Sequence, residues 1–200
     1  MSRSFRRTPQ RAKGERRVAE ILEAAATVIA EVGYETCTMT AIAERAGASI
    51  GTVYQYFPNK EAVVRALRLQ YGDEIGTRWM ELAERAHGVP IPHLVDGMFS
   101  VLVDFWERRP AYFVLLSVPT QYRRDPGARN RLRSLFATLF RSSNPNLHAA
   151  EAFRVANVAL QIVKGLQPLW AQATKSERPA LLQEFKAALT AYLTARLAVT

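Results

Sequence analysis

The segment from Thr38 to Lys60 most strongly constrains how this chain can fold. Its sequence, TMTAIAERAGASIGTVYQYFPNK, holds two short stretches of helical spacing separated by small residues. Thr38 and Ser49 each stand where a side-chain hydroxyl can accept a free backbone amide of a helix's first turn. Gly47 lies between the stretches, where a tight turn favours a positive φ. The segment is predicted to form two short helices and a turn, followed by a third helix that Asn59 caps.

Small and apolar residues distinguish a helix-turn-helix from a plain αα-hairpin. A plain hairpin needs only the inward apolar positions, which are Ile42, Ala46, Ala48, Val53 and Tyr56. A helix-turn-helix also needs a small residue where its second helix crosses the first, and Ala43 meets that need. The joint placing of Ala43, Gly47 and Val53 therefore favours the helix-turn-helix.

The outer face of the second short helix carries side chains typical of a helix that contacts DNA. It carries Ile50, Gly51, Thr52, Tyr54 and Gln55, none of which suits a core. Gln55 can read a base edge, with adenine as the best geometric match. The Thr and Tyr hydroxyls suit phosphate oxygens.

The run T-x-T-x-I-A-x-x-A-G-x-S-x-G-T-V-Y-x-Y-F-x-N-K-E closely resembles the DNA-binding region of the TetR family of transcriptional regulators. The resemblance covers about Val18 to Val64 and implies a homodimer on a palindromic double-stranded DNA operator. The family's DNA contacts correspond here to Thr38, Thr40, Ser49, Ile50, Gly51, Thr52, Tyr54, Gln55, Tyr56 and Lys60, with Lys60 as a phosphate-binding lysine. Ile50 departs from the family pattern, in which Lys or another polar residue is common. A contact is either lost there or replaced by an apolar one, such as one to a thymine methyl.

Charge adds a second indication of a polyanionic partner. The chain of 200 residues has a formal net charge of +9. Seven basic residues stand against Glu15 between Met1 and Arg17: Arg3, Arg6, Arg7, Arg11, Lys13, Arg16 and Arg17. This segment is either a solvated arm or an arm that contacts phosphates.

Several function classes are not expected. Cys37 is the single cysteine, which excludes an intrachain disulfide and favours a reducing compartment. With Ile42 it is expected to form a hydrophobic staple. No apolar run is long enough for a membrane span, and the N-terminus lacks the apolar core of a secretory signal, so we expect a cytoplasmic protein with no membrane contact. The histidines lack metal spacing and no catalytic motif appears, so no metal, cofactor or enzymatic activity is predicted.

The remaining sequence has helical spacing almost throughout. We expect an all-α chain of about nine helices, with a basic arm and helix-turn-helix domain over residues 1–60 and an effector-binding and dimerisation domain over residues 61–200. The first helix is expected from Arg11 to Val32, ended by Gly33. Further helices are expected over 61–86, for about eighteen residues from Pro92, over 111–118, from Pro126, over 147–173 with a kink at Pro168, and after a Ser176 cap.

The last two helices are the predicted dimer surface, because they are rich in Ala and Leu on more than one face. The alternative is that they pack only on their own domain.

The middle helices hold the predicted effector site. In the TetR family the corresponding helices enclose a ligand cavity, which implies contacts from Trp79, Phe99, Trp106, Phe113, Tyr122 and Phe136. Asn157 and Gln161 lie four residues apart within an apolar stretch and are the predicted polar groups that orient the ligand. The aromatic residues are alternatively plain core, and Asn157 and Gln161 can instead satisfy one another or cap buried backbone groups. The lack of inward carboxylate pairs favours a neutral or weakly acidic, hydrophobic ligand. Six arginines between Arg123 and Arg141 form either a solvated helix face or a surface that attracts an anionic effector or DNA.

We therefore predict a ligand-responsive repressor that a hydrophobic small molecule releases from its operator. The alternatives are an activator of the same family, a repressor with more than one dimer per site, and a small-molecule carrier that keeps a vestigial DNA unit. A redox sensor through Cys37 is the least favoured alternative.

Overall fold

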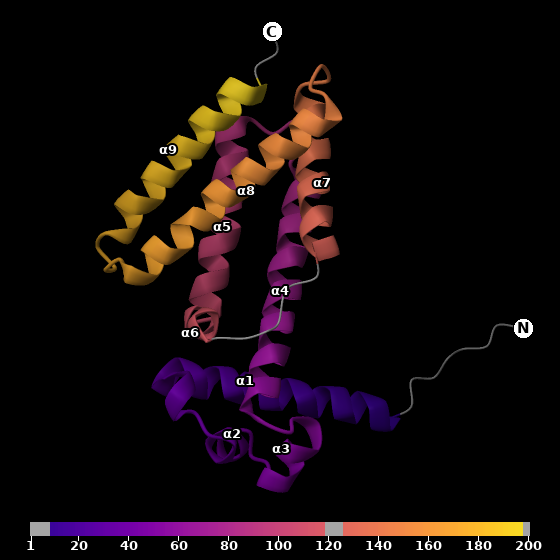
Figure 1. The fold of residues 1–200 in the computed structure, drawn as a ribbon, viewed down its shortest axis with the longest axis vertical. Helices are drawn as coiled ribbons and strands as arrows, with labels where there is room; N and C mark the ends of the chain where they lie inside the picture. Colours follow the sequence, from indigo (N-terminus) through magenta and orange to yellow (C-terminus); the bar gives the residue numbers. More distant parts are fainter. Residues whose placement is uncertain (1–8, 119–125, 198–200) are drawn as a thin grey trace, which may run out of the picture. The chain divides into compact units, whose positions relative to one another are not determined.

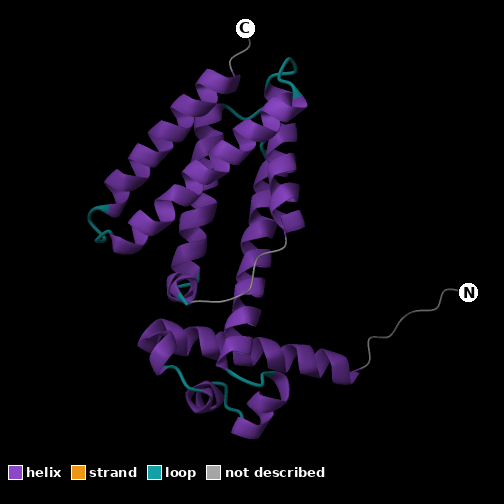
Figure 2. Cartoon of the chain, in the orientation of Figure 1, coloured by secondary structure: helices purple, strands orange, loops and turns teal. Residues whose placement is uncertain are grey.

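A computed structural model describes residues 9–118 and 126–197 of the chain. Within these residues the chain forms nine α-helices and no strand, which confirms the all-α prediction (Figures 1 and 2). The helices are α1 (Pro9–Thr36), α2 (Met39–Arg45), α3 (Ile50–Tyr56), α4 (Lys60–Arg85), α5 (Ile91–Arg108), α6 (Ala111–Ser117), α7 (Pro126–Ser143), α8 (Ala149–Gln172) and α9 (Arg178–Leu197). None of the described helices is long and apolar enough to cross a membrane.

The helices group into two compact units. The first unit comprises residues 1–71 and 109–122, and so contains α1 to α3, the first part of α4, and α6. The second unit comprises residues 72–108 and 123–200, with the rest of α4, α5, and α7 to α9. The expected boundary after residue 60 divides the chain by function and stays a prediction. By packing, the start of α4 and the whole of α6 belong with α1 to α3.

Helix α1 organises the first unit through one buried face. Ile21, Ala25 and Ile29 follow helical spacing, and all three have no exposed surface. The regular helix stops at Gly33, whose φ of 81° is the left-handed value expected there. At its other end α1 starts at Pro9, two residues before the expected Arg11, so the part of the basic segment from residue 9 onward is helical and not an extended arm.

The second unit is a helical bundle in which α8 packs between α7 and α9, and α5 also packs against α9 (Figure 1). Its core is aromatic, with the ring of Trp79 against Phe136 and the ring of Phe136 against Phe140. Helix α8 continues through Pro168 to Gln172.

The cap before α9 differs from the expectation at Ser176. The carboxylate of Glu177 instead accepts from the backbone N–H of Thr174 at 2.8 Å and from its hydroxyl at 2.7 Å. Glu177 follows Thr174 by three positions, which is the spacing of a capping box, and this signal was overlooked in the sequence.

Two glycines offer a matched test of backbone conformation. A Cβ would meet nothing within 4 Å at Gly47 or at Gly76, but Gly47 has a φ of +57° whereas Gly76 lies inside α4. We expect Gly47→Ala to lower the free energy of unfolding by about 1–2 kcal/mol. Gly76→Ala should raise it by about 0.5–1 kcal/mol, because alanine is the better helix former. Urea denaturation followed by circular dichroism measures both, and equal shifts would contradict the turn assignment.

Candidate nucleic-acid interface

The helix-turn-helix of α2 and α3 is built from the local signals in the sequence. The Thr38 hydroxyl accepts from the backbone N–H of Ala41 at 3.1 Å, and the Ser49 hydroxyl accepts from that of Thr52 at 3.1 Å. The backbone N–H of Ala48 donates to the carbonyl of Ala43 at 2.9 Å and closes the turn. Both expected caps and the turn are therefore present.

Small and apolar side chains hold the two helices together. Ile42 and Val53 have no exposed surface, and Ala43 is 2% exposed. Helix α2 packs on both α1 and α3, and Figure 1 shows α2 and α3 on the same side of α1. The buried methyl of Ala43 is what allows the helices to approach closely.

The predicted DNA-contacting residues lie together on the outside of this unit. Exposed side chains or backbone are found at Thr38, Thr40, Ser49, Ile50, Gly51, Tyr54, Gln55 and Tyr56, while Thr52 and Lys60 are half-buried. The hydroxyls of Ser49 and Thr52 lie 2.8 Å apart and share a hydrogen bond. The hydrogen-bonding capacity of that pair is therefore partly used within the protein.

Arg17 belongs to the turn of the helix-turn-helix. Its guanidinium donates to the carbonyls of Ala46 at 3.4 Å and Gly47 at 3.2 Å, and forms an ion pair with Glu20 at 2.8 Å. The sequence pattern by itself assigns Arg17 to the basic N-terminal segment. Its role in the turn was overlooked, because the two carbonyls lie about thirty residues away in sequence.

Lys60 also has partners inside the protein. Its ammonium donates to the carbonyls of Tyr34 at 2.7 Å and Glu35 at 3.2 Å, and lies 4.2 Å from the centroid of the Tyr34 ring. These carbonyls follow Gly33, whose backbone conformation interrupts the regular helix of α1. Lys60 thus ties the end of α1 to the start of α4, and its predicted phosphate contact stays a prediction.

Cys37 is a packing residue in the structure. Only 1% of it is exposed, and burial raises the pKa of its thiol, with the charge of Lys60 acting in the opposite direction. A raised pKa leaves less of the reactive thiolate at neutral pH. Nothing in this environment favours a redox sensor.

Helix α6 is fixed to the first unit by two arginines that sequence reasoning overlooked. Arg68 of α4 donates to the carbonyls of Leu115 and Val118 at the end of α6, and burial lowers the pKa of its guanidinium. Arg109, just before α6, forms an ion pair with Glu23 of α1 at 3.1 Å. The sequence offered one indication of this contact, because Arg68 lies between two leucine residues of α4.

The aromatic residues of the predicted effector site fall into three groups. Trp79, Phe99, Trp106 and Phe136 are buried in the second unit, where Phe99 faces Phe185 and Trp106 faces Trp170. Phe113 is half-buried in α6 of the first unit. Tyr122 lies outside the described residues.

The two polar residues of that set, Asn157 and Gln161, have different surroundings. Asn157 is half-buried, and its side-chain oxygen is buried without a hydrogen-bond partner among the described residues. Gln161 is exposed. The alternative in which Gln161 satisfies the Asn157 oxygen is therefore wrong.

Two of the six arginines between Arg123 and Arg141 bond to groups close in sequence. Arg133 donates to the Asn130 side chain at 3.1 Å, and Arg141 donates to the carbonyl of Leu147 at 3.2 Å. Arg123 and Arg124 lie outside the described residues. In the part of the chain that the structure describes, no group of three His, Cys, Asp or Glu side chains is placed to hold a metal ion.

We expect Lys60→Ala to destabilise the first unit as well as to weaken DNA binding. Loss of a charged donor to two carbonyls should lower the free energy of unfolding by about 1–2 kcal/mol. Lys13→Ala is the matched control, because it removes the same charge from an exposed site on α1. Urea denaturation followed by circular dichroism measures the effect, and equal midpoints for the two variants would contradict the anchoring role.

Comparison with known proteins agrees with this geometry. Residues 21–67 match the family model described as bacterial regulatory proteins, tetR family, and residues 90–193 match the tetracyclin repressor-like C-terminal domain. The transcriptional regulator BetI of Cronobacter sakazakii is 26% identical in an alignment of 193 positions that covers 90% of each chain. The transcriptional repressor KstR of Mycolicibacterium smegmatis is 47% identical over 100 residues, which are 50% of this chain and 47% of KstR.

A solved complex of SmeT with triclosan has a similar fold, with a TM-score of 0.63, 20% identity, and coverage of 90% of this chain and 91% of SmeT. The two family models together include every predicted DNA contact and most of the second unit. The chain therefore belongs to the TetR family of transcriptional regulators, which are DNA-binding proteins without enzymatic activity.

Proposed function

We propose that this regulator is a cytoplasmic repressor that binds a palindromic operator as a homodimer and leaves it when a hydrophobic small molecule binds. The observation that carries the proposal is the exposed face of α3, held by a fully packed helix-turn-helix. Similarity to KstR, which is named a repressor, supports repression over activation. Residues 1–60 are assigned to DNA binding, and residues 61–200 to effector binding and dimerisation.

DNA recognition divides between base reading and backbone contact. Gln55 is exposed on α3 and has the bidentate geometry that suits adenine. Thr38, Thr40 and the exposed tyrosines supply hydroxyls for phosphate or sugar contacts. Two copies of α3 on successive major grooves imply half-sites about 34–36 Å apart, or a near multiple.

The proposed dimer surface consists of α8 and α9. On α8 the exposed side chains include Val158, 41% exposed, and Leu169, 46% exposed, at positions that share a helix face with Gln161. On α9 the exposed residues include Ala187, Ala188 and Ala191, whose small side chains permit close approach. A symmetric four-helix packing would bury both sets. Gln161 fits this surface better than a ligand pocket.

The proposed effector site lies among the aromatic side chains of the second unit, with Asn157 as a polar group. Its buried side-chain oxygen has no partner among the described residues, so a ligand donor would satisfy it. SmeT, a neighbour in fold, is known in complex with triclosan, which supports a hydrophobic ligand. The chain passes directly from α5 into α6, and α6 is bonded to α1 and α4 through Arg109 and Arg68. A ligand that prefers one position of α6 by ~1–3 kcal/mol would shift the free energy of DNA binding by at most that amount.

Gln55→Ala tests base reading. An operator selected by the full-length protein from random duplexes should bind the variant about tenfold more weakly, while an unrelated duplex binds unchanged. Lys13→Ala serves as the control, because loss of a phosphate-directed charge weakens both duplexes alike. Fluorescence anisotropy at fixed salt gives the dissociation constants. Equal losses on both duplexes for Gln55→Ala would refute the base-reading role.

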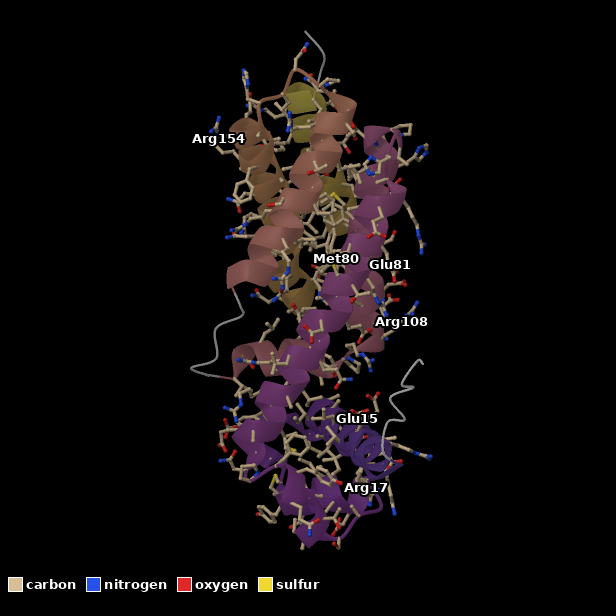
Figure 3. All side chains as sticks on the ribbon, turned by 90° about the vertical axis from the view of Figure 1, so that its right-hand side faces the viewer. Glu15, Arg17, Met80, Glu81, Arg108 and Arg154 are labelled. Atoms are coloured by element: carbon tan, nitrogen blue, oxygen red, sulfur yellow. The ribbon has the colours of Figure 1, made fainter. Side chains whose placement is uncertain are left out.

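A charge on the proposed dimer surface tests assembly. The double variant Val158→Arg, Leu169→Arg should be a monomer in light scattering and lose at least about a hundredfold in operator affinity, because the half-sites no longer bind together. Met80→Arg is the control, since Met80 is 43% exposed on α4 of the same unit (Figure 3). A dimeric double variant would place the interface elsewhere.

A further inference from the structure

Ile50 is an exposed apolar side chain at the start of the recognition helix. It is 40% exposed, although isoleucine is among the residue types most often buried. Helix α3 runs IGTVYQY and holds no charged residue. One helical turn on, Tyr54 is 51% exposed and lies on the same face, while Val53 points into the core with no exposed surface. The outer stripe of α3 is therefore apolar and aromatic.

The polar groups around Ile50 are poorly placed to read bases in its stead. Gly51 has no side chain. The hydroxyls of Ser49 and Thr52 bond each other at 2.8 Å, and the Ser49 hydroxyl also accepts the Thr52 backbone N–H. Ile50 is thus the large side chain that this end of α3 presents outward.

The major groove of DNA offers one apolar partner. Base edges there display hydrogen-bond donors and acceptors, and the exception is the C5-methyl group of thymine. An isoleucine placed against a polar edge would strip water from it without giving a hydrogen bond in return. Against a thymine methyl, both groups lose only apolar surface, and the stiff β-branched side chain has little freedom to lose.

We infer that Ile50 is a specificity-determining residue that selects a thymine in each operator half-site by contact with its C5-methyl group. The inference rests on the proposed function, since it requires α3 to lie in the major groove. The inference specifies which base is recognised, thymine, and which chemical group of that base, the C5-methyl. The protein should distinguish thymine from uracil at this position, although both pair with adenine and present the same hydrogen-bonding groups.

Deoxyuridine substitution isolates the methyl group. From an operator selected from random duplexes by the full-length protein, each thymine of a half-site is replaced in turn by deoxyuridine, together with its symmetry equivalent. We expect one position where the affinity falls roughly fourfold per half-site, and roughly fifteenfold for both, as burial of one methyl group predicts. Ile50→Ala should bind the unmodified operator more weakly and show no further loss with deoxyuridine there. Ile50→Val should keep part of the loss.

The following controls and outcomes distinguish failure of the Ile50 inference from failure of the proposed function. Gln55→Ala should retain the full deoxyuridine effect, because the two side chains read different groups. A selected operator without any deoxyuridine-sensitive position, or one whose sensitivity persists in Ile50→Ala, would overturn the inference and leave the proposed function standing. Failure of the wild-type protein to select any sequence would overturn both. Thermal unfolding checks each variant, and exposed Ile50 tolerates truncation without a core cavity.

Discussion

Backbone carbonyls left without partners at helix ends are the constraint on which the first unit depends. The last carbonyls of a helix have no amide to bond within it, so other groups must satisfy them. Here three basic side chains do so, each toward two carbonyls. Arg17 holds the turn between α2 and α3, Lys60 holds the end of α1, and Arg68 holds the end of α6.

This use of basic side chains changes how the net charge is understood. A formal charge of +9 favours a polyanionic partner, but charge alone does not say which residues meet it. Arg17 and Lys60 lie in the DNA-binding unit, and both donate hydrogen bonds to backbone carbonyls of that unit. Arg16 is exposed but pairs with Glu20 at 3.1 Å. Lys13 on α1 is also exposed, and it is the basic side chain that we propose for phosphate contact. The outward face of α3 carries no charge. In the complex proposed above, discrimination between sequences at this helix would therefore depend on shape, amide and methyl contacts.

In the second unit, burial alone does not distinguish a core residue from a ligand-binding one. Its aromatic residues suit both a core and a ligand site, and the structure places Trp79, Phe99 and Phe136 in mutual or neighbouring ring contacts. Burial of this kind stabilises the unit whether or not a ligand binds. A polar atom without a partner is the more telling feature, because it carries a desolvation cost that only a donor relieves. That makes Asn157 the informative residue of the set.

The sequence by itself determined the helices of the DNA-binding unit, their caps and their turn. Thr38, Ser49, Gly33 and Gly47 act within three or four residues of themselves, so their effects can be read locally. The family resemblance was likewise carried by a short contiguous run. Only the tertiary structure decided which basic side chains are occupied, that α6 packs with the DNA-binding unit, and that Asn157 and Gln161 differ in exposure. These properties depend on groups 25 or more residues apart, such as Arg68 and Val118, and no local spacing encodes such contacts.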